Sequence, residues 1–189
     1  MDLEDGGTYE DLRLEGGTLE VGTGVSITSS RLRGVSLAGA HLRMAHMRDV
    51  ELRDCDLSGC RLEQCGLERI SLTGCRLTGA QLHRCQASGT RLKQCVGQYV
   101  SFDGVSFRGA IFEDCELSES SFINCALDGA ELRGSRLNES VIEGGSWTDC
   151  DLRGCPIDGL RVRLQDLAGV RVDLEQGMAL LRSANIIVG

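Results

Sequence analysis

The sequence predicts an all-β solenoid, a narrow coil that turns a corner every five residues. An apolar or small residue occupies every fifth position from Ile27 to Val172, and none of these 30 centre positions is charged. A second column, two positions before each centre, is also uncharged, and Gln165 is its one large polar member. A period of five fits neither the 3.6-residue period of a helix nor the alternation of a strand, so it indicates a repeat architecture.

The other residues of each five are mostly polar, charged or glycine, which places two side chains inside the coil and three outside. Glycine recurs two positions after the centre, where we expect a tight corner with positive φ. These glycines are Gly34, Gly39, Gly59, Gly74, Gly79, Gly104 and Gly109.

One stretch leaves the centre column under-filled. Ala87 and Gly97 stand where leucine is usual, and they lie close together. We therefore expect a local bulge or off-pattern turn at 96–100, with Val96 or Tyr99 shifted inward to fill the space.

A second irregularity is an over-large residue. Trp147 occupies a position that leucine usually holds, and its neighbour in the small column is Gly145. Because protein cores are close-packed, we expect the glycine to compensate for the volume of the indole.

Composition and charge favour a soluble, cytoplasmic protein. Of 189 residues only 4% are aromatic, glycine occurs 25 times and proline once, and the net charge is −8. The chain starts with acidic residues and no apolar run follows them, so we expect no signal peptide. No apolar stretch is long enough to span a membrane.

The cysteines are expected to be buried, reduced core residues. All ten lie in the small column, where they alternate with Ala, Ser, Thr and Val. They show neither the Cys-x-x-Cys spacing nor the histidine company of a metal site, and free cysteine packs as a small hydrophobe. The ten are Cys55, Cys60, Cys65, Cys75, Cys85, Cys95, Cys115, Cys125, Cys150 and Cys155.

The period divides the chain into three parts. Residues 1–25 carry seven carboxylates against Arg13 alone, and we expect an acidic cap or an irregular first coil with a bulge near Gly22–Gly24. A flexible acidic tail is the alternative. Residues 26–172 form the repeat solenoid, and residues 173–189 form a separate C-terminal segment.

The C-terminal segment has the pattern of a short helix followed by a strand. Asp173 is the expected N-cap and Gln176 reaches back to it, as in a capping box. Residues 185–188 are apolar enough for a short strand. The segment covers either the open coil of its own chain or that of a two-fold partner.

The repeats resemble those of pentapeptide-repeat proteins over about residues 25–174. The resemblance is carried by Cys-Asp-Leu-Ser-Gly (55–59), Cys-Arg-Leu-Thr-Gly (75–79) and Ala-Glu-Leu-Arg-Gly (130–134). It implies a right-handed, quadrilateral β-helix with four repeats per coil. Thirty repeats make about 7.5 coils, or about 36 Å at about 4.8 Å per coil.

The C-terminus resembles that of the MfpA and Qnr branch of this family. The similarity lies in Val172-Asp173, Gln176 and the run from Ala184 to Gly189. It implies a homodimer through the C-terminal segment. We place the interface at Leu174, Met178, Leu181, Ile186 and Ile187, the first three of which form an apolar stripe.

We expect no enzyme, cofactor or metal site. The three histidines, His41, His46 and His83, take outward positions without metal spacing, and no nucleophile or phosphate-loop motif occurs. A solenoid spreads its carboxylates over flat faces, which do not form the pocket that paired acid–base chemistry needs.

One side of the solenoid is acidic. The side built on Leu37, Leu57 and their successors every twenty residues has a net charge of −3, in which Arg76 and Arg136 offset part of the acid. We expect its carboxylates to bind a partner, and we select Asp56, Glu116, Glu119, Glu139 and Asp158.

The MfpA and Qnr resemblance implies a rod that imitates B-form DNA. Such a rod binds DNA gyrase or topoisomerase IV, and it inhibits the enzyme or protects it from quinolones or natural poisons. The unbroken period lacks the inserted loops of Qnr proteins, which favours direct inhibition, or immunity to some poison other than a quinolone. The repeat region nets only −2, against about 21 charges on DNA of that length, so the mimicry rests on shape and the acidic strip.

The alternative is a structural or adaptor rod for an unrelated protein partner. The five-residue period is equally compatible with that role. Direct nucleic-acid binding is disfavoured, because the net charge is −8 and no face is dominantly basic.

Overall fold

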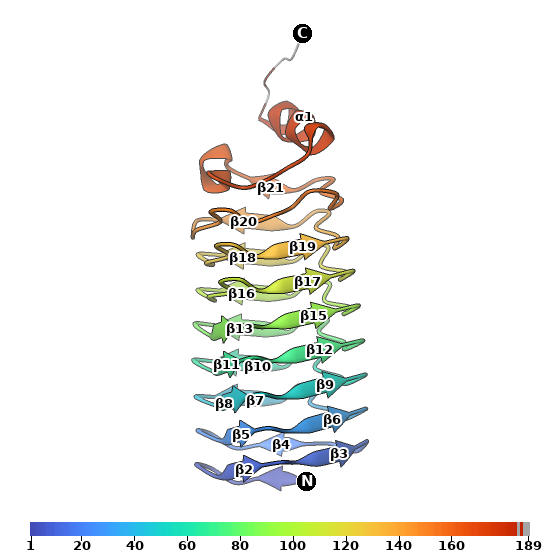
Figure 1. Ribbon diagram of the computed structural model, residues 1–189, viewed down its shortest axis with the longest axis vertical. Helices are drawn as coiled ribbons and strands as arrows, with labels where there is room; N and C mark the ends of the chain where they lie inside the picture. Colours follow the sequence, from blue (N-terminus) through green and yellow to red (C-terminus); the bar gives the residue numbers. More distant parts are fainter. Residues whose placement is uncertain (185, 187–189) are drawn as a thin grey trace.

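The computed structural model describes residues 1–184 and 186 and is a parallel β-solenoid of about eight turns with one short C-terminal helix (Figure 1). The coils stack from the N-terminus at one end to helix α1 (Leu174–Ser183) at the other. Strands pair in parallel with the strand one coil away, so that Leu62 lies between Leu42 and Leu82. The solenoid predicted from the period is confirmed.

The prism has four sides, three of which are sheets. One seven-stranded sheet consists of β3 (Arg13–Glu15), β6 (Arg31–Arg33), β9 (Glu51–Arg53), β12 (Ser71–Thr73), β15 (Arg91–Lys93), β17 (Ile111–Glu113) and β19 (Glu131–Arg133). The other consists of β7 (His41–Arg43), β10 (Arg61–Glu63), β13 (Gln81–His83), β16 (Ser101–Asp103), β18 (Ser121–Ile123), β20 (Val141–Glu143) and β21 (Arg161–Val162). The five-stranded sheet consists of β2 (Thr8–Glu10), β5 (Ser26–Thr28), β8 (His46–Arg48), β11 (Gly66–Glu68) and β14 (Gln86–Ser88).

The fourth side is a ladder of single bridges, with one residue paired in each coil. It runs through Thr18, Ser36, Asp56, Arg76, Val96, Glu116 and Arg136. This side contains most of the predicted acidic strip, and we call it the bridge face.

The first coil is shorter than the rest. Tyr9 pairs with Ile27 and Leu14 with Leu32, a spacing of 18 residues, whereas Ile27 pairs with Met47 at a spacing of 20. Strands β1 (Asp2–Leu3) and β4 (Glu20–Val21) pair within the same end. The shortening lies in the turn around Gly22, where a Cβ atom would approach the Leu3 carbonyl oxygen to 2.8 Å.

The corners confirm the predicted backbone conformation. Gly34, Gly59 and Gly104 have φ of 61°, 63° and 63°, in the left-handed region that glycine enters without steric cost. Where the corner is not glycine it is often Asp or Asn, such as Asp54 and Asn124, both with φ 52°. These side chains tolerate the left-handed conformation better than most.

The under-filled stretch contains no bulge, so the expectation of an inward shift at 96–100 was wrong. Val96 keeps its bridges to Arg76 and Glu116, and it is 42% exposed. Tyr99 is 57% exposed. Leu117 of the next coil and Val100 fill the space beside Gly97. A Cβ atom there would meet Leu117 Cδ2 at 3.0 Å and Val100 Cγ2 at 3.2 Å.

The structure gives a different reason for the glycine near Trp147. Gly145 is exposed and has φ 83°, and a Cβ atom there would lie 1.9 Å from the carbonyl oxygen of Cys125. The residue therefore allows a close backbone approach rather than sharing core volume. The indole of Trp147 is buried and packs edge-on against Phe122, with ring centroids 5.5 Å apart.

The C-terminal helix closes the last coil. Its capping box is present as predicted, because Gln176 N donates to Asp173 Oδ1 and Asp173 N donates to Gln176 Oε1, both at 2.9 Å. A short 3-10 helix, η1 (Leu164–Leu167), precedes it. The strand predicted over 185–188 falls, apart from Ile186, outside the described residues.

Candidate partner-binding surface

The structure brings four of the five selected carboxylates together. Glu116, Glu119, Glu139 and Asp158 lie on the bridge face or its edge in successive coils near the C-terminal end, and Glu139 N donates to the carbonyl oxygen of Asp158 at 2.7 Å. We call these four residues the acidic strip. Asp56 lies three coils away, with Arg76 and Val96 between it and Glu116 in the ladder.

Asp56 also has a local structural role. Its Oδ1 accepts a hydrogen bond from Ser58 N at 2.9 Å, which closes a turn. The hydrogen bonds from Ser58 lower the pKa of Asp56, and Arg76 adds a smaller electrostatic effect. Asp56 is therefore separate from the acidic strip.

The edge of the strip is a stack of corner residues. Tyr99, Glu119 and Glu139 occupy the same corner of three successive coils, with φ of 59°, 59° and 57°. The neighbouring Glu119 carboxylate raises the pKa of Tyr99. The Glu139 carboxylate lies over Gly159. The corner thus presents a phenol and two carboxylates in line along the prism.

The strip is also where carboxylates lack basic partners. Residues 101–160 contain twelve carboxylates. Six of them form ion pairs with Lys or Arg, namely Glu113, Glu116, Asp128, Glu131, Asp149 and Asp151, and Asp103 contacts His83, which is charged only when protonated. In the part of the chain that the structure describes, the other five form none, and three of these five, Glu119, Glu139 and Asp158, belong to the acidic strip. The Glu116 pair with Arg136 is long, at 3.9 Å.

Charge is also segregated along the axis of the prism. This segregation is not visible when the charges are summed over each of the four sides. The three coils of residues 101–160 hold twelve carboxylates and four arginines, a net −8, whereas residues 26–100 hold eleven basic and six acidic residues, a net +5. Three coils are about 14 Å tall, so these coils carry about one negative charge per 1.8 Å. Duplex DNA carries one per about 1.7 Å. A coil-by-coil count of the sequence would have found this.

The C-terminal end next to the strip is closed by Gln176. Its Nε2 donates to the carbonyl oxygens of Leu152 at 2.6 Å and Cys155 at 2.8 Å. The Leu152 oxygen also accepts from Cys155 N at 3.0 Å, so within the described residues it is the Cys155 oxygen that depends on Gln176 for a donor. Sequence reasoning assigned Gln176 to the capping box and missed this second role. Leu180, which the predicted stripe omits, is buried with it.

The predicted interface residues lie on the outer side of this closure. Leu174 is 83% exposed, Ile186 is exposed, and Met178 and Leu181 are half-buried. Ile187 lies outside the described residues.

The described residues show no cluster of metal ligands. They include no group of three or more His, Cys, Asp or Glu side chains placed to hold a metal ion. All ten cysteines are buried free thiols, and burial raises the pKa of Cys60 and Cys150 to about 12. Within these residues, no helix is long and apolar enough to cross a membrane.

Family models match most of the prism. The model described as a pentapeptide repeat region matches residues 25–102, and the model of pentapeptide repeats matches 101–138 and 115–155. None of the curated proteins compared with the chain matches its sequence.

Solved structures of similar architecture have low sequence identity. QnrB1, a plasmid-mediated fluoroquinolone resistance protein, is 21% identical with a TM-score of 0.39, and the match covers 95% of this chain and 100% of that one. HetL, a pentapeptide repeat protein involved in heterocyst differentiation regulation from the cyanobacterium Nostoc, is 18% identical with a TM-score of 0.35, over 88% of this chain and 89% of that one.

Proposed function

The chain belongs to the pentapeptide-repeat family, and from that premise we propose that it is a DNA mimic that binds a type II topoisomerase, chiefly DNA gyrase. The protein acts by occupying the surface where the enzyme holds duplex DNA, so its role needs no catalysis and no cofactor. Such a role places it in the cytoplasm with its target.

The observation that carries the proposal is the charge density of coils 101–160. Net −8 over about 14 Å matches the density of a duplex, although the whole repeat region does not. Within these coils the acidic strip, Glu116, Glu119, Glu139 and Asp158, presents carboxylates that largely lack basic partners and are free to meet Lys and Arg of an enzyme.

A C-terminal homodimer extends this acidic segment. Two prisms joined at their α1 ends, through Leu174, Met178, Leu181, Ile186 and Ile187, place two acidic segments next to the two-fold axis. The rod is then about 70–80 Å long, roughly two turns of duplex. Its basic coils lie further out on both sides.

Direct inhibition is the form of activity that the chain favours. Parallel pairing continues at a 20-residue spacing from Ser26 to Arg171, so no loop is inserted between these coils. The protein then competes with DNA for the enzyme without a projecting element that reaches a bound drug.

The test is a gyrase supercoiling assay with purified protein titrated in, with and without a quinolone, and repeated at higher salt. We expect inhibition in both cases, weakened by salt because the contact is electrostatic. Rescue of supercoiling in the presence of quinolone would instead indicate protection. No effect on gyrase or topoisomerase IV would contradict the proposal and favour an adaptor that binds an unrelated protein.

A further inference from the structure

The interior of the prism is not filled evenly. In the C-terminal half, Leu117, Leu127, Leu132 and Leu137 are 0% exposed. In the preceding coils, leucines of the same centre column keep 7–9% exposure although they point at the axis: Leu57, Leu62, Leu67, Leu72, Leu77 and Leu82. Both sets are leucines at the centre position of a repeat. The greater exposure of the second set therefore comes from unfilled space inside the prism.

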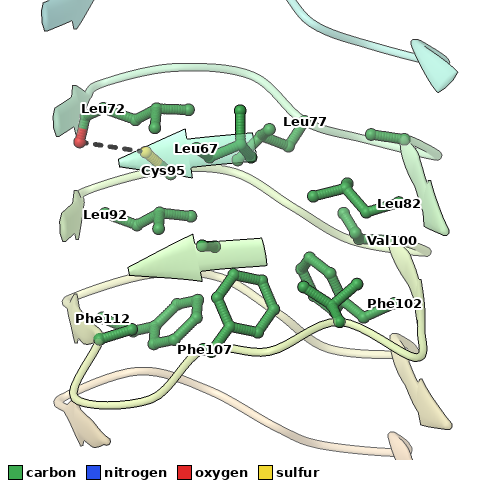
Figure 2. Close-up of a cluster of buried hydrophobic side chains, with 14 of the residues drawn as sticks. Leu67, Leu72, Leu77, Leu82, Leu92, Cys95, Val100, Phe102, Phe107 and Phe112 are labelled. Carbon is green, nitrogen blue, oxygen red and sulfur yellow. Dashed lines mark hydrogen bonds between the residues drawn. The ribbon is translucent and has the colours of Figure 1, made fainter. Parts of the chain in front are cut away.

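That surface belongs to an internal cavity of about 70 Å³. It extends along the axis from the coil of Leu37 to the coil of Phe102 and Phe107. Figure 2 shows Leu72 and Leu92 pointing inward from one side of the prism and Leu82 from the opposite side, with the rings of Phe102, Phe107 and Phe112 in the next coil.

The sequence explains where the cavity ends. Centre positions 102, 107, 112 and 122 are phenylalanine, and their rings contact one another with centroids 4.9–5.4 Å apart. The coils before them have only leucine, isoleucine or methionine at the centre, or the smaller Ala87 and Gly97. In these earlier coils the aliphatic side chains leave the middle of the prism open, and the rings of Phe102 and Phe107 end the cavity.

The cavity is dry. Only apolar atoms are exposed on its wall, and the hydroxyl of Thr90, which has no hydrogen-bond partner, contributes no polar surface to it. A cavity of this size has room for water, but a water molecule needs two to four polar partners. Apolar cavities without such partners stay empty and accept xenon or small hydrocarbons.

We propose that the axial cavity between the coils of Leu37 and Phe107 is a binding site for a small apolar molecule without hydrogen-bonding groups. The ligand contacts leucine side chains from all four sides and gains dispersion contacts that the wall now lacks. It enters by local opening of the coils, as ligands of buried cavities do. The site is independent of the gyrase proposal.

The test uses xenon as the probe and two substitutions at equivalent repeat positions. Leu77→Phe adds a ring inside the cavity, and Leu127→Phe adds one in the packed half, where the leucine is 0% exposed. Crystals of each protein are pressurised with xenon, and thermal unfolding is recorded with and without the gas. Leu57→Phe is a second filling variant, in case Leu77→Phe does not fold.

We expect a xenon peak on the axis of the unsubstituted protein and a rise in its unfolding temperature under xenon. Both are lost in Leu77→Phe or Leu57→Phe. Leu127→Phe keeps the peak but unfolds at a lower temperature, because it over-packs a filled core. Absence of the peak from the unsubstituted protein, or its persistence in both filling variants, would overturn the proposal.

Discussion

At the scale of single residues, what a missing Cβ would meet decides whether a glycine can be replaced. Gly145 has φ 83° and its backbone lies against Cys125, whereas Gly177 is inside helix α1 and a Cβ there meets nothing within 4 Å. The two positions are therefore opposite cases in one chain.

Gly145→Ala is expected to destabilise the protein by more than about 2 kcal/mol, because a left-handed conformation alone costs a non-glycine residue about 1–2 kcal/mol and the Cβ would collide with a carbonyl oxygen. Gly177→Ala is expected to stabilise it by up to about 1 kcal/mol, the difference in helix propensity. Denaturant unfolding measures both. Equal effects of the two substitutions would contradict the assigned geometry.

The buried thiols predict a stability that depends on alkaline pH. Burial raises the pKa of Cys60 to about 12 and of Cys125 to about 11, from an ordinary value near 9.0. The folded state thus holds protons that the unfolded state releases above pH 9, so the thiols stabilise the fold below that pH and lose their effect as pH rises through 11 to 12.

We expect the unfolding free energy to fall between pH 9 and 11, and less steeply in Cys60→Ala. Alanine suits that position, since Ala80 occupies the equivalent small-column position one coil on. Native protein at pH 8 should react with a thiol reagent at none of its ten cysteines, and unfolded protein at all ten. Rapid reaction of several thiols in the native protein would show that the cysteines of the small column are not buried.

At the scale of elements, the C-terminal helix has two jobs. Its inner side closes the last coil through Gln176 and Leu180, and its outer side presents Leu174. Substitutions on the two sides should separate folding from association.

Gln176→Ala leaves the carbonyl oxygen of Cys155 without a donor, takes one of two donors from that of Leu152, and removes half of the capping box. We expect a loss of about 1–3 kcal/mol, the usual cost of an unsatisfied buried polar group. The control is Glu175→Ala, an exposed neighbour in the same turn, which should change stability little. Comparable losses of stability in the two variants would mean that the hydrogen bonds of Gln176 to the last coil do not stabilise the protein.

Leu174→Glu tests the proposed dimer. The side chain is 83% exposed in the single chain, so the substitution should leave the circular dichroism spectrum and unfolding of the monomer unchanged. Sedimentation should show a dimer for the unsubstituted protein and a monomer for the variant. A variant that remains dimeric would place the interface elsewhere.

Sequence reasoning succeeds here where the cause is local. The period of five predicts the coil, the recurring glycines predict the positive φ at corners such as Gly59, and the spacing of Asp173 and Gln176 predicts the capping box, because each depends on residues close in the chain. It fails where the cause crosses coils. Leu117 of the next coil fills space at Gly97, and Gln176 reaches Leu152, contacts that no local pattern contains.

At the scale of the whole molecule, the distribution of charge matters more than its total. The net −8 conceals an acidic first coil, a basic middle and an acidic segment of three coils before the C-terminus. Assigning charges to sides alone led to Asp56 being grouped with residues three coils away. The axial segregation is what makes one part of the prism comparable to duplex DNA.

The most direct test compares two charge-reversal variants that carry the same number of substitutions on different parts of the surface. One variant carries Lys at Glu116, Glu119, Glu139 and Asp158, and the other carries Lys at Glu4, Glu10, Glu15 and Glu20, which are exposed in the first coil. Arg69 and Arg84 already hold corner positions with φ 52° and 50°, so lysine is compatible with the corners at 119 and 139.

Both variants change the net charge equally, and both are titrated into the gyrase supercoiling assay after their folding is checked by circular dichroism. We expect the strip variant to lose inhibition by at least about tenfold and the first-coil variant to stay within about twofold of the unsubstituted protein, since contact rather than distant charge sets affinity. Equal loss in both, or no loss in the strip variant, would contradict DNA mimicry through the acidic strip.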